Sequence, residues 1–206
     1  MPYAQREDWR KQQACQEIVR RLLFETDKPE RSEQVKLAVS KSYRLDTIPR
    51  NSDILAVAKA EERRVLRERL QLKQVRNISG VHVIGVMASP EQCPHGRCAY
   101  CPQESDAPTS YTGYEPAALR AKQSDFNPRA QITSRLAQLQ AIGHRTSKIE
   151  LVVQGGTFLA RPLKYQRHFI QRCFDALNGN ESASLAEAKT EAVSSKIRNV
   201  GLTFET

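Results

Sequence analysis

Val81-His-Val-Ile-Gly-Val-Met87 leads into a loop that contains Cys93-Pro-His-Gly-Arg-Cys98-Ala-Tyr-Cys101. The apolar run predicts a buried strand. Three thiolates are an odd number, so this loop alone cannot close a tetrahedral four-thiolate site. Three thiolates suit a [4Fe–4S] cluster whose fourth iron stays open to another ligand. We therefore expect Cys93, Cys98 and Cys101 to hold such a cluster on the loop of residues 88–114, called the cysteine loop below.

Zinc is the competing interpretation of the same loop. Cys93, His95, Cys98 and Cys101 would together supply three thiolates and one imidazole. His95, however, is only two residues from Cys93 and three from Cys98, which makes simultaneous ligation awkward. The spacing favours the iron–sulfur cluster.

The use of cysteine also bears on the compartment. Three of the five cysteines crowd into one loop, and the N-terminus shows no apolar signal-peptide core. This clustering favours metal over disulfides. No apolar stretch approaches the roughly 18 residues that span a bilayer, so we expect a cytoplasmic protein with no membrane span. The two other cysteines, Cys15 and Cys173, lie on apolar helical stripes and are predicted to be buried small hydrophobes.

Strands and helices alternate after residue 80. We predict strands over 81–87, 148–153 and 199–204, and helices over 128–143, 163–178 and 185–197. This order predicts an α/β fold with parallel βα units. The cysteine loop, Gly155-Gly156 and Glu205 each follow a strand, so we expect them at one edge of the sheet, where such folds bind ligands.

The first 75 residues differ in character. They are predicted to be helical, over 9–24, from Ser32, from Asn51 and over 61–73. The chain carries a formal charge of +9, and residues 1–80 hold 18 Lys and Arg against 12 Asp and Glu. This basic excess is a weak indication of a polyanionic partner such as RNA, and an ordinary basic domain would show it too.

The open iron would suit the amino and carboxylate groups of S-adenosylmethionine, whose cleavage would give a 5′-deoxyadenosyl radical. Tyr100 would pack against the adenine, and Gly155-Gly156 would let the backbone approach the methionine end closely. Tyr111-Thr-Gly-Tyr114 would either stack RNA bases or pack the cysteine loop itself.

Several motifs together resemble one family, the Elongator catalytic subunit, which carboxymethylates the wobble uridine of tRNA. The spacing of the motifs resembles the shorter spacing of the prokaryotic members of that family. The resemblance is carried by Cys93-Pro-His-Gly-Arg-Cys-Ala-Tyr-Cys-Pro102, Ser110-Tyr-Thr-Gly-Tyr-Glu-Pro116, Gly155-Gly-Thr-Phe158, Gly201-Leu-Thr-Phe-Glu-Thr206, Ile48-Pro-Arg-Asn-Ser-Asp-Ile-Leu55 and Val75-Arg-Asn-Ile-Ser-Gly-Val81.

The resemblance implies a function. Acetyl-CoA would supply the unit added to uridine C5, and Lys148 would contact it. Residues 1–75 would bind tRNA, and residues 76–206 would form the N-terminal half of a radical S-adenosylmethionine (βα) barrel. A homodimer or an Elongator-type assembly is implied as well. The cofactor contacts would be Tyr100, Gly155, Gly156, Thr157 and Glu205.

The chain also departs from the family pattern. Gln103-Glu104 stands where the family has Gly-Gly, and Gln154 replaces an apolar residue. Because the sequence ends at Thr206, after the third strand, we expect a fragment without the remaining barrel strands and the acetyltransferase domain. The alternative function is a non-catalytic tRNA-binding or assembly module with a structural metal.

Overall fold

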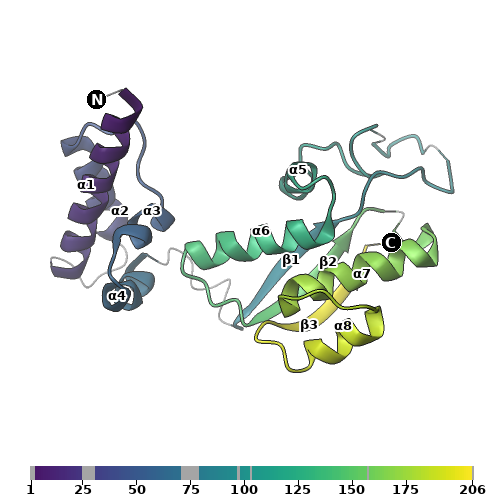
Figure 1. Cartoon of the computed structure of the whole chain (residues 1–206). Coiled ribbons are helices and arrows are strands. Elements are labelled where there is room, and N and C mark those ends of the chain that lie inside the picture. Colours follow the sequence, from purple (N-terminus) through teal and green to yellow (C-terminus); the bar gives the residue numbers. More distant parts are fainter. Residues whose placement is uncertain are drawn as a thin grey trace. The chain divides into compact units, whose positions relative to one another are not determined.

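The structure, a computed structural model, describes residues 3–24, 31–70, 79–96, 98–102, 104–156 and 158–205 (Figure 1). It divides into two compact units. The first comprises Met1–Ile78 together with Gln138–His144, and the second comprises Ser79–Ala137 together with Arg145–Thr206. No helix among the described residues is long and apolar enough to cross a bilayer.

The first unit contains four helices from the N-terminal region. They are α1 (Tyr3–Phe24), α2 (Ser32–Ser42), α3 (Asn51–Val57) and α4 (Ala60–Leu70). Apolar residues recur every three or four positions in α1, which gives that helix one apolar face. The core that this face helps to form includes Cys15, Ile18, Leu22, Ile54, Leu66 and Leu70. The predicted helices are therefore present, although α1 begins earlier than expected, and residues 71–73 of the predicted fourth helix lie outside the described residues.

Polar contacts connect the helices of this unit. Asn51, at the start of α3, donates from Nδ2 to the Leu70 carbonyl at 2.7 Å and accepts from Lys36 Nζ at 3.0 Å. Lys11 in α1 pairs with Asp53 in α3 at 2.8 Å. One short helix is thus joined to each of the three others.

The second unit is built on a parallel three-stranded sheet. The strands are β1 (Val81–Met87), β2 (Lys148–Gln154) and β3 (Arg198–Phe204), in the order β1-β2-β3. Val81 pairs with Lys148, and Lys148 pairs with Arg198. The predicted α/β fold, a helical region followed by three parallel strands, is confirmed.

The helices of this unit are α5 (Pro116–Gln123), α6 (Pro128–Ala141), α7 (Leu163–Asn178) and α8 (Leu185–Ala192), with a short 3₁₀ turn, η3 (Phe158–Ala160). The sequence interpretation missed α5, although a proline at its first position is a typical start signal. Helix α8 ends five residues earlier than predicted, at Ala192 rather than residue 197. Helix α7 ends as predicted, at Gly179 with φ +82°.

Helices α6 and α7 lie over one face of the sheet (Figure 1). Ile84, Val86, Leu151 and Val153 are buried in the strands. The Phe158 ring packs edge-on against Phe169 of α7 with centroids 5.2 Å apart and stacks on Phe204 of β3 at 5.5 Å. These contacts hold the turn after β2 against both its helix and the neighbouring strand.

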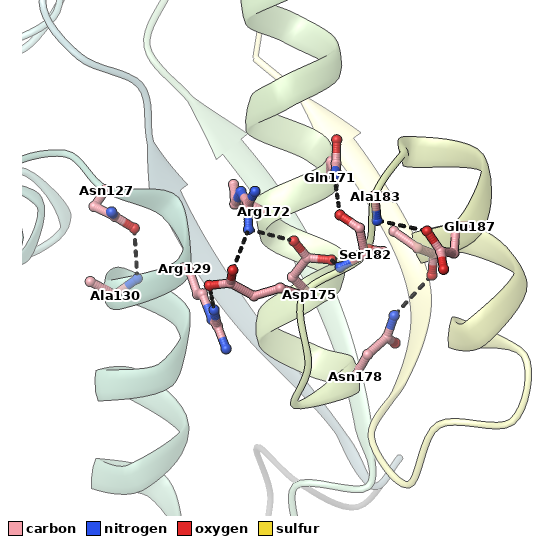
Figure 2. A network of polar contacts seen from close by, with 12 residues as sticks. Asn127, Arg129, Ala130, Gln171, Arg172, Asp175, Asn178, Ser182, Ala183 and Glu187 are labelled. Carbon is pink, nitrogen blue, oxygen red and sulfur yellow. Dashed lines mark hydrogen bonds and ion pairs between the residues drawn. The ribbon is translucent and has the colours of Figure 1, made fainter.

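A polar network fixes the connection between α7 and α8 (Figure 2). The fully buried Asp175 carboxylate accepts hydrogen bonds from the backbone N–H of Ser182 at 3.2 Å and from the Ser182 hydroxyl. Arg172 lies 3.1 Å from the same carboxylate and 3.7 Å from that of Glu181, which Arg129 of α6 also pairs with. A buried carboxylate is thus balanced by one cation and two neutral donors.

We expect Asp175→Ala to lower the free energy of unfolding by about 3 kcal/mol, because it leaves Arg172 and the Ser182 donors without their buried acceptor. Glu181→Ala removes the other partner of Arg172, but its side chain is 65% exposed, so the loss should stay below about 1 kcal/mol. Urea-induced unfolding followed by circular dichroism measures both. Equal losses in the two variants would contradict this account of the network.

Candidate functional site

Backbone pairing continues past the strands at the carboxyl edge of the sheet. Ala88 N–H donates to the Gln154 carbonyl at 3.0 Å, and Glu205 N–H donates to the Val153 carbonyl at 3.0 Å. The segments that follow β1, β2 and β3 therefore start side by side. This places the root of the cysteine loop, Gly155 and Glu205 at one edge, as the parallel topology predicts.

The Glu205 carboxylate connects two of these segments. Its Oε2 accepts from the Gly155 backbone N–H at 3.0 Å and from the Tyr111 hydroxyl at 2.5 Å. Burial raises the pKa of Tyr111, and the neighbouring Glu205 raises it further. Tyr111 thus remains a protonated donor at neutral pH, and the cysteine loop is tied to the end of β3.

The two glycines after β2 serve different purposes. Gly155 has φ +113°, a backbone conformation that side chains with a Cβ rarely adopt. Gly156 has ordinary φ, but a Cβ there would lie 3.1 Å from Ser110 Oγ and 3.5 Å from the Thr109 carbonyl. The cysteine loop therefore lies in the space that a Cβ at position 156 would need.

The three loop cysteines are free thiols that reach the surface. Cys98 is exposed, and Cys93 and Cys101 are partly exposed. Gly96 N–H donates to the Cys93 carbonyl at 2.9 Å, and Cys101 Sγ lies 3.2 Å from Ser110 Oγ. Among the residues that the structure describes, no three Cys, His, Asp or Glu side chains are grouped as metal ligands.

The donor chemistry of the loop nevertheless fits an iron–sulfur cluster. A cluster is held by Cys thiolates, and Cys93, Cys98 and Cys101 are all free, so each can act as a ligand. A pocket of about 650 Å³ opens within the loop, and its lining includes Glu91, Cys93, Glu104 and Thr109. Only one of the three cysteines lines it.

His95 is the fourth ligand in the zinc interpretation. Its Nδ1 lies 3.7 Å from Cys93 Sγ, a hydrogen-bond contact between neighbours on the loop. The imidazole and this one thiol are adjacent, but the other two cysteines do not join them in a group of ligands within the described part of the loop.

The remaining predicted residues are scattered. Tyr100 is 94% exposed to solvent. Lys148 is exposed at the amino end of β2, the strand end opposite to the cysteine loop. Thr157 lies outside the described residues, as do Gln103 and the last residue of the chain.

Some contributors to this edge were missed by the sequence interpretation. Glu115 accepts from Thr112 N–H at 2.8 Å and Gly113 N–H at 3.0 Å, and these bonds, led by the one from Thr112, lower its pKa. Tyr111 packs against Met87 and the small residues of α5, whereas Tyr114 is 82% exposed. The motif around residues 110–116 therefore orders the loop, and the Glu-Pro at its end was the available sign of a helix start.

The sequence of the chain is similar to several known proteins. Residues 11–78 match the family model described as the ELP3 N-terminal domain. The chain is 44% identical over 200 residues to the tRNA uridine(34) acetyltransferase of Methanocaldococcus jannaschii, covering 92% of this chain and 37% of that protein. It is 38% identical over 202 residues to Elongator complex protein 3 of Drosophila melanogaster, with 92% and 37% covered.

Among solved structures, the archaeal Methanocaldococcus infernus Elp3 with N-terminus deletion (1-46) is similar, with 37% identity and a TM-score of 0.47. The match covers 62% of this chain and 23% of that one. The chain belongs to the Elp3 family, and it spans little more than a third of the length of the curated relatives it matches.

The five cysteines should separate into two classes on alkylation. Burial raises the pKa of Cys15 to about 11, with Asp53 adding to the shift, and burial beside Asp175 raises that of Cys173. Since only the thiolate reacts, we expect iodoacetamide near neutral pH to label Cys93, Cys98 and Cys101 at least about tenfold faster than the other two. Peptide mass spectrometry of the native chain measures the rates. Fast labelling of Cys173 would contradict the buried core described above.

Proposed function

We propose that this chain is part of an enzyme that modifies the wobble uridine of tRNA with a radical generated from S-adenosylmethionine. The observation that carries the proposal is that the loop bearing three free cysteines leaves a parallel sheet at the same edge as Gly155, Gly156 and Glu205. The names of relatives, tRNA uridine(34) acetyltransferase and Elongator complex protein 3, support tRNA as the substrate.

Cys93, Cys98 and Cys101 would hold the [4Fe–4S] cluster as thiolates. When bound, the cluster supplies the electron that cleaves S-adenosylmethionine to a carbon radical. The protein's own part is to bind and orient. Glu205 accepts the Gly155 N–H and so fixes the turn that would face the methionine end. The exposed ring of Tyr100 would cover the adenine.

The proposal extends to the carbon donor, the assembly and the compartment. Acetyl-CoA would supply the carbon unit for a carboxymethyl product at uridine C5, and the acetyltransferase names of relatives are consistent with its use. Lys148 is assigned to acetyl-CoA on the family resemblance alone. An Elongator-type assembly or a homodimer would be the working form. Clustered free thiols suit a reducing compartment, so we propose a cytoplasmic location.

The second candidate is a non-catalytic tRNA-binding or assembly module. It is favoured by the basic excess of residues 1–80, which hold 18 Lys and Arg against 12 Asp and Glu. Both candidates share an electrostatic tRNA contact, which the first unit would provide through exposed arginines of α4, such as Arg64 and Arg67. Metal content and S-adenosylmethionine cleavage separate the two candidates.

Anaerobic reconstitution with iron and sulfide tests the enzymatic proposal. We expect about four irons per chain and a broad visible absorption, both lost in Cys98→Ala. Cys15→Ala is the matched control, because its thiol is buried in the helical core, and it should keep the cluster. The reduced protein should then cleave S-adenosylmethionine to 5′-deoxyadenosine.

The opposite results would be equally clear. Stoichiometric zinc without iron would remove the radical mechanism and favour the binding module. A reconstituted cluster that is unaffected by Cys98→Ala would place the iron elsewhere in the chain.

Binding of tRNA should be strongly salt-dependent. If Arg64 and Arg67 contact phosphates, the double variant Arg64→Gln with Arg67→Gln should bind with a weaker salt dependence. The negative slope of log affinity against log salt should become shallower by about 2, one for each lost contact. Fluorescence anisotropy with labelled tRNA at several salt concentrations measures the slope. Lys189→Gln with Lys196→Gln, in the second unit, removes the same charge and should leave the slope nearly unchanged. Equal effects of the two double variants would show that the salt dependence follows the net charge and not a contact at Arg64 and Arg67.

A further inference from the structure

The segment between β1 and the first loop cysteine is held from outside the cysteine motif. This segment, residues 88–91, is called the stem below. It leaves the sheet beside β2 through the Ala88–Gln154 backbone hydrogen bond and reaches Cys93 two residues later. Its position therefore sets where Cys93 begins.

Arg161, which follows η3, binds the stem through a nearly buried side chain. The side chain is 9% exposed. Its Nη1 donates to the Ser89 carbonyl and its Nη2 donates to the Ser89 hydroxyl, each at 3.0 Å. Its Nε lies 3.3 Å from Glu91 Oε2 as an ion pair without a hydrogen bond. One planar guanidinium thus contacts the stem at both Ser89 and Glu91.

Tyr165 of α7 binds the same stem residue, Ser89. Its hydroxyl oxygen accepts the Ser89 backbone N–H at 3.2 Å and lies 3.2 Å from the Ser89 hydroxyl. The Arg161 guanidinium lies over the same ring, 3.9 Å from its centroid. The ring packs in turn against Phe158 at 6.2 Å and Phe169 at 5.9 Å. The tyrosine thereby connects the stem to the aromatic core under the sheet.

The far side of the stem connects to the end of the cysteine motif. Thr109 Oγ1 donates to the Glu91 carbonyl at 3.0 Å. The next residue, Ser110, donates its N–H to the Pro102 carbonyl at 3.1 Å and places Oγ beside Cys101 Sγ. The chain before Cys93 and the chain after Cys101 are thus joined through two adjacent residues.

We propose that Arg161 and Tyr165 are positioning residues for the cysteine loop. They fix the stem so that Cys93 is presented in the place where it would bind a cluster together with Cys98 and Cys101. Ligation of the cluster rests on the proposed function, but the contacts of Arg161 and Tyr165 with the stem do not. A lysine at position 161 would keep the charge, yet it cannot donate in one plane to both Ser89 oxygens while lying flat on an aromatic ring.

Two conservative variants test this role without disturbing the core. Tyr165→Phe removes the hydroxyl that contacts the N–H and the hydroxyl of Ser89, and it keeps the ring contacts. Arg161→Lys keeps the charge and removes the planar fork. Arg167→Lys, on an exposed position of α7, is the matched control. Each is measured in the whole chain, first without metal and then after reconstitution with iron and sulfide.

In the metal-free chain, hydrogen exchange of the peptide that contains Ser89 is expected to accelerate by about tenfold in both variants, with strands β2 and β3 unchanged. After reconstitution, the variants should lose iron to a chelator faster than the control. The electron paramagnetic resonance spectrum of the reduced cluster should also change shape, which a loss of stability alone would not cause in the molecules that retain iron.

The outcomes separate the two proposals. Unchanged exchange at Ser89 overturns the claim that Arg161 and Tyr165 hold the stem. Faster exchange with an unchanged resonance spectrum and unchanged iron loss overturns its role for the cluster. Exchange that accelerates throughout the sheet overturns a local role and makes both residues general stabilisers. If the unaltered chain binds no iron at all, the proposed function fails, and the exchange result still decides whether the stem is held.

Discussion

Parallel pairing of three short strands is the constraint on which the candidate site depends. Because β1, β2 and β3 run in the same direction and pair along their lengths, with one register shift between β2 and β3, the segments that follow them leave the sheet at one edge. The cysteine loop, Gly155 and Glu205 are far apart in the sequence and meet only for this reason. Lys148 begins a strand instead of following one, and the same constraint places it at the opposite edge.

Side chains then convert this neighbourhood into a defined arrangement. Glu205 accepts from both Gly155 and Tyr111, so the last strand holds the turn after β2 and the end of the cysteine loop together. The missing Cβ at Gly156 lets Ser110 approach, and Ser110 in turn contacts Cys101. The exposed stretch that carries Cys98 and Tyr100 lies between segments anchored in this way. A loop with fixed ends and solvent-facing thiols suits a cofactor that completes the site on binding.

Periodic segments were predicted well, and the reason is physical. The strand at Val81–Met87 is an apolar run except for His82, and α7 shows apolar residues at helical spacing before a glycine, so local patterns suffice. The short helix α5 has only eight residues and is held by contacts of Ala118 and Ala121 with Met87, so its periodicity gave little signal. The end of α8 was overestimated because no strong stop residue follows Ala192 in the sequence.

The sequence by itself determined the α/β class, the order of the strands and of the helices other than α5, the burial of Cys15 and Cys173, and the loop that carries three cysteines. These depend on residue type and spacing along the chain. Only the tertiary structure decided that Glu205 would reach Gly155 and Tyr111, that Gly156 would make room for Ser110, and that Arg161 and Tyr165 would hold Ser89. Such contacts join residues tens of positions apart, and they arise because strand pairing and helix packing fix distances in space that no local pattern encodes.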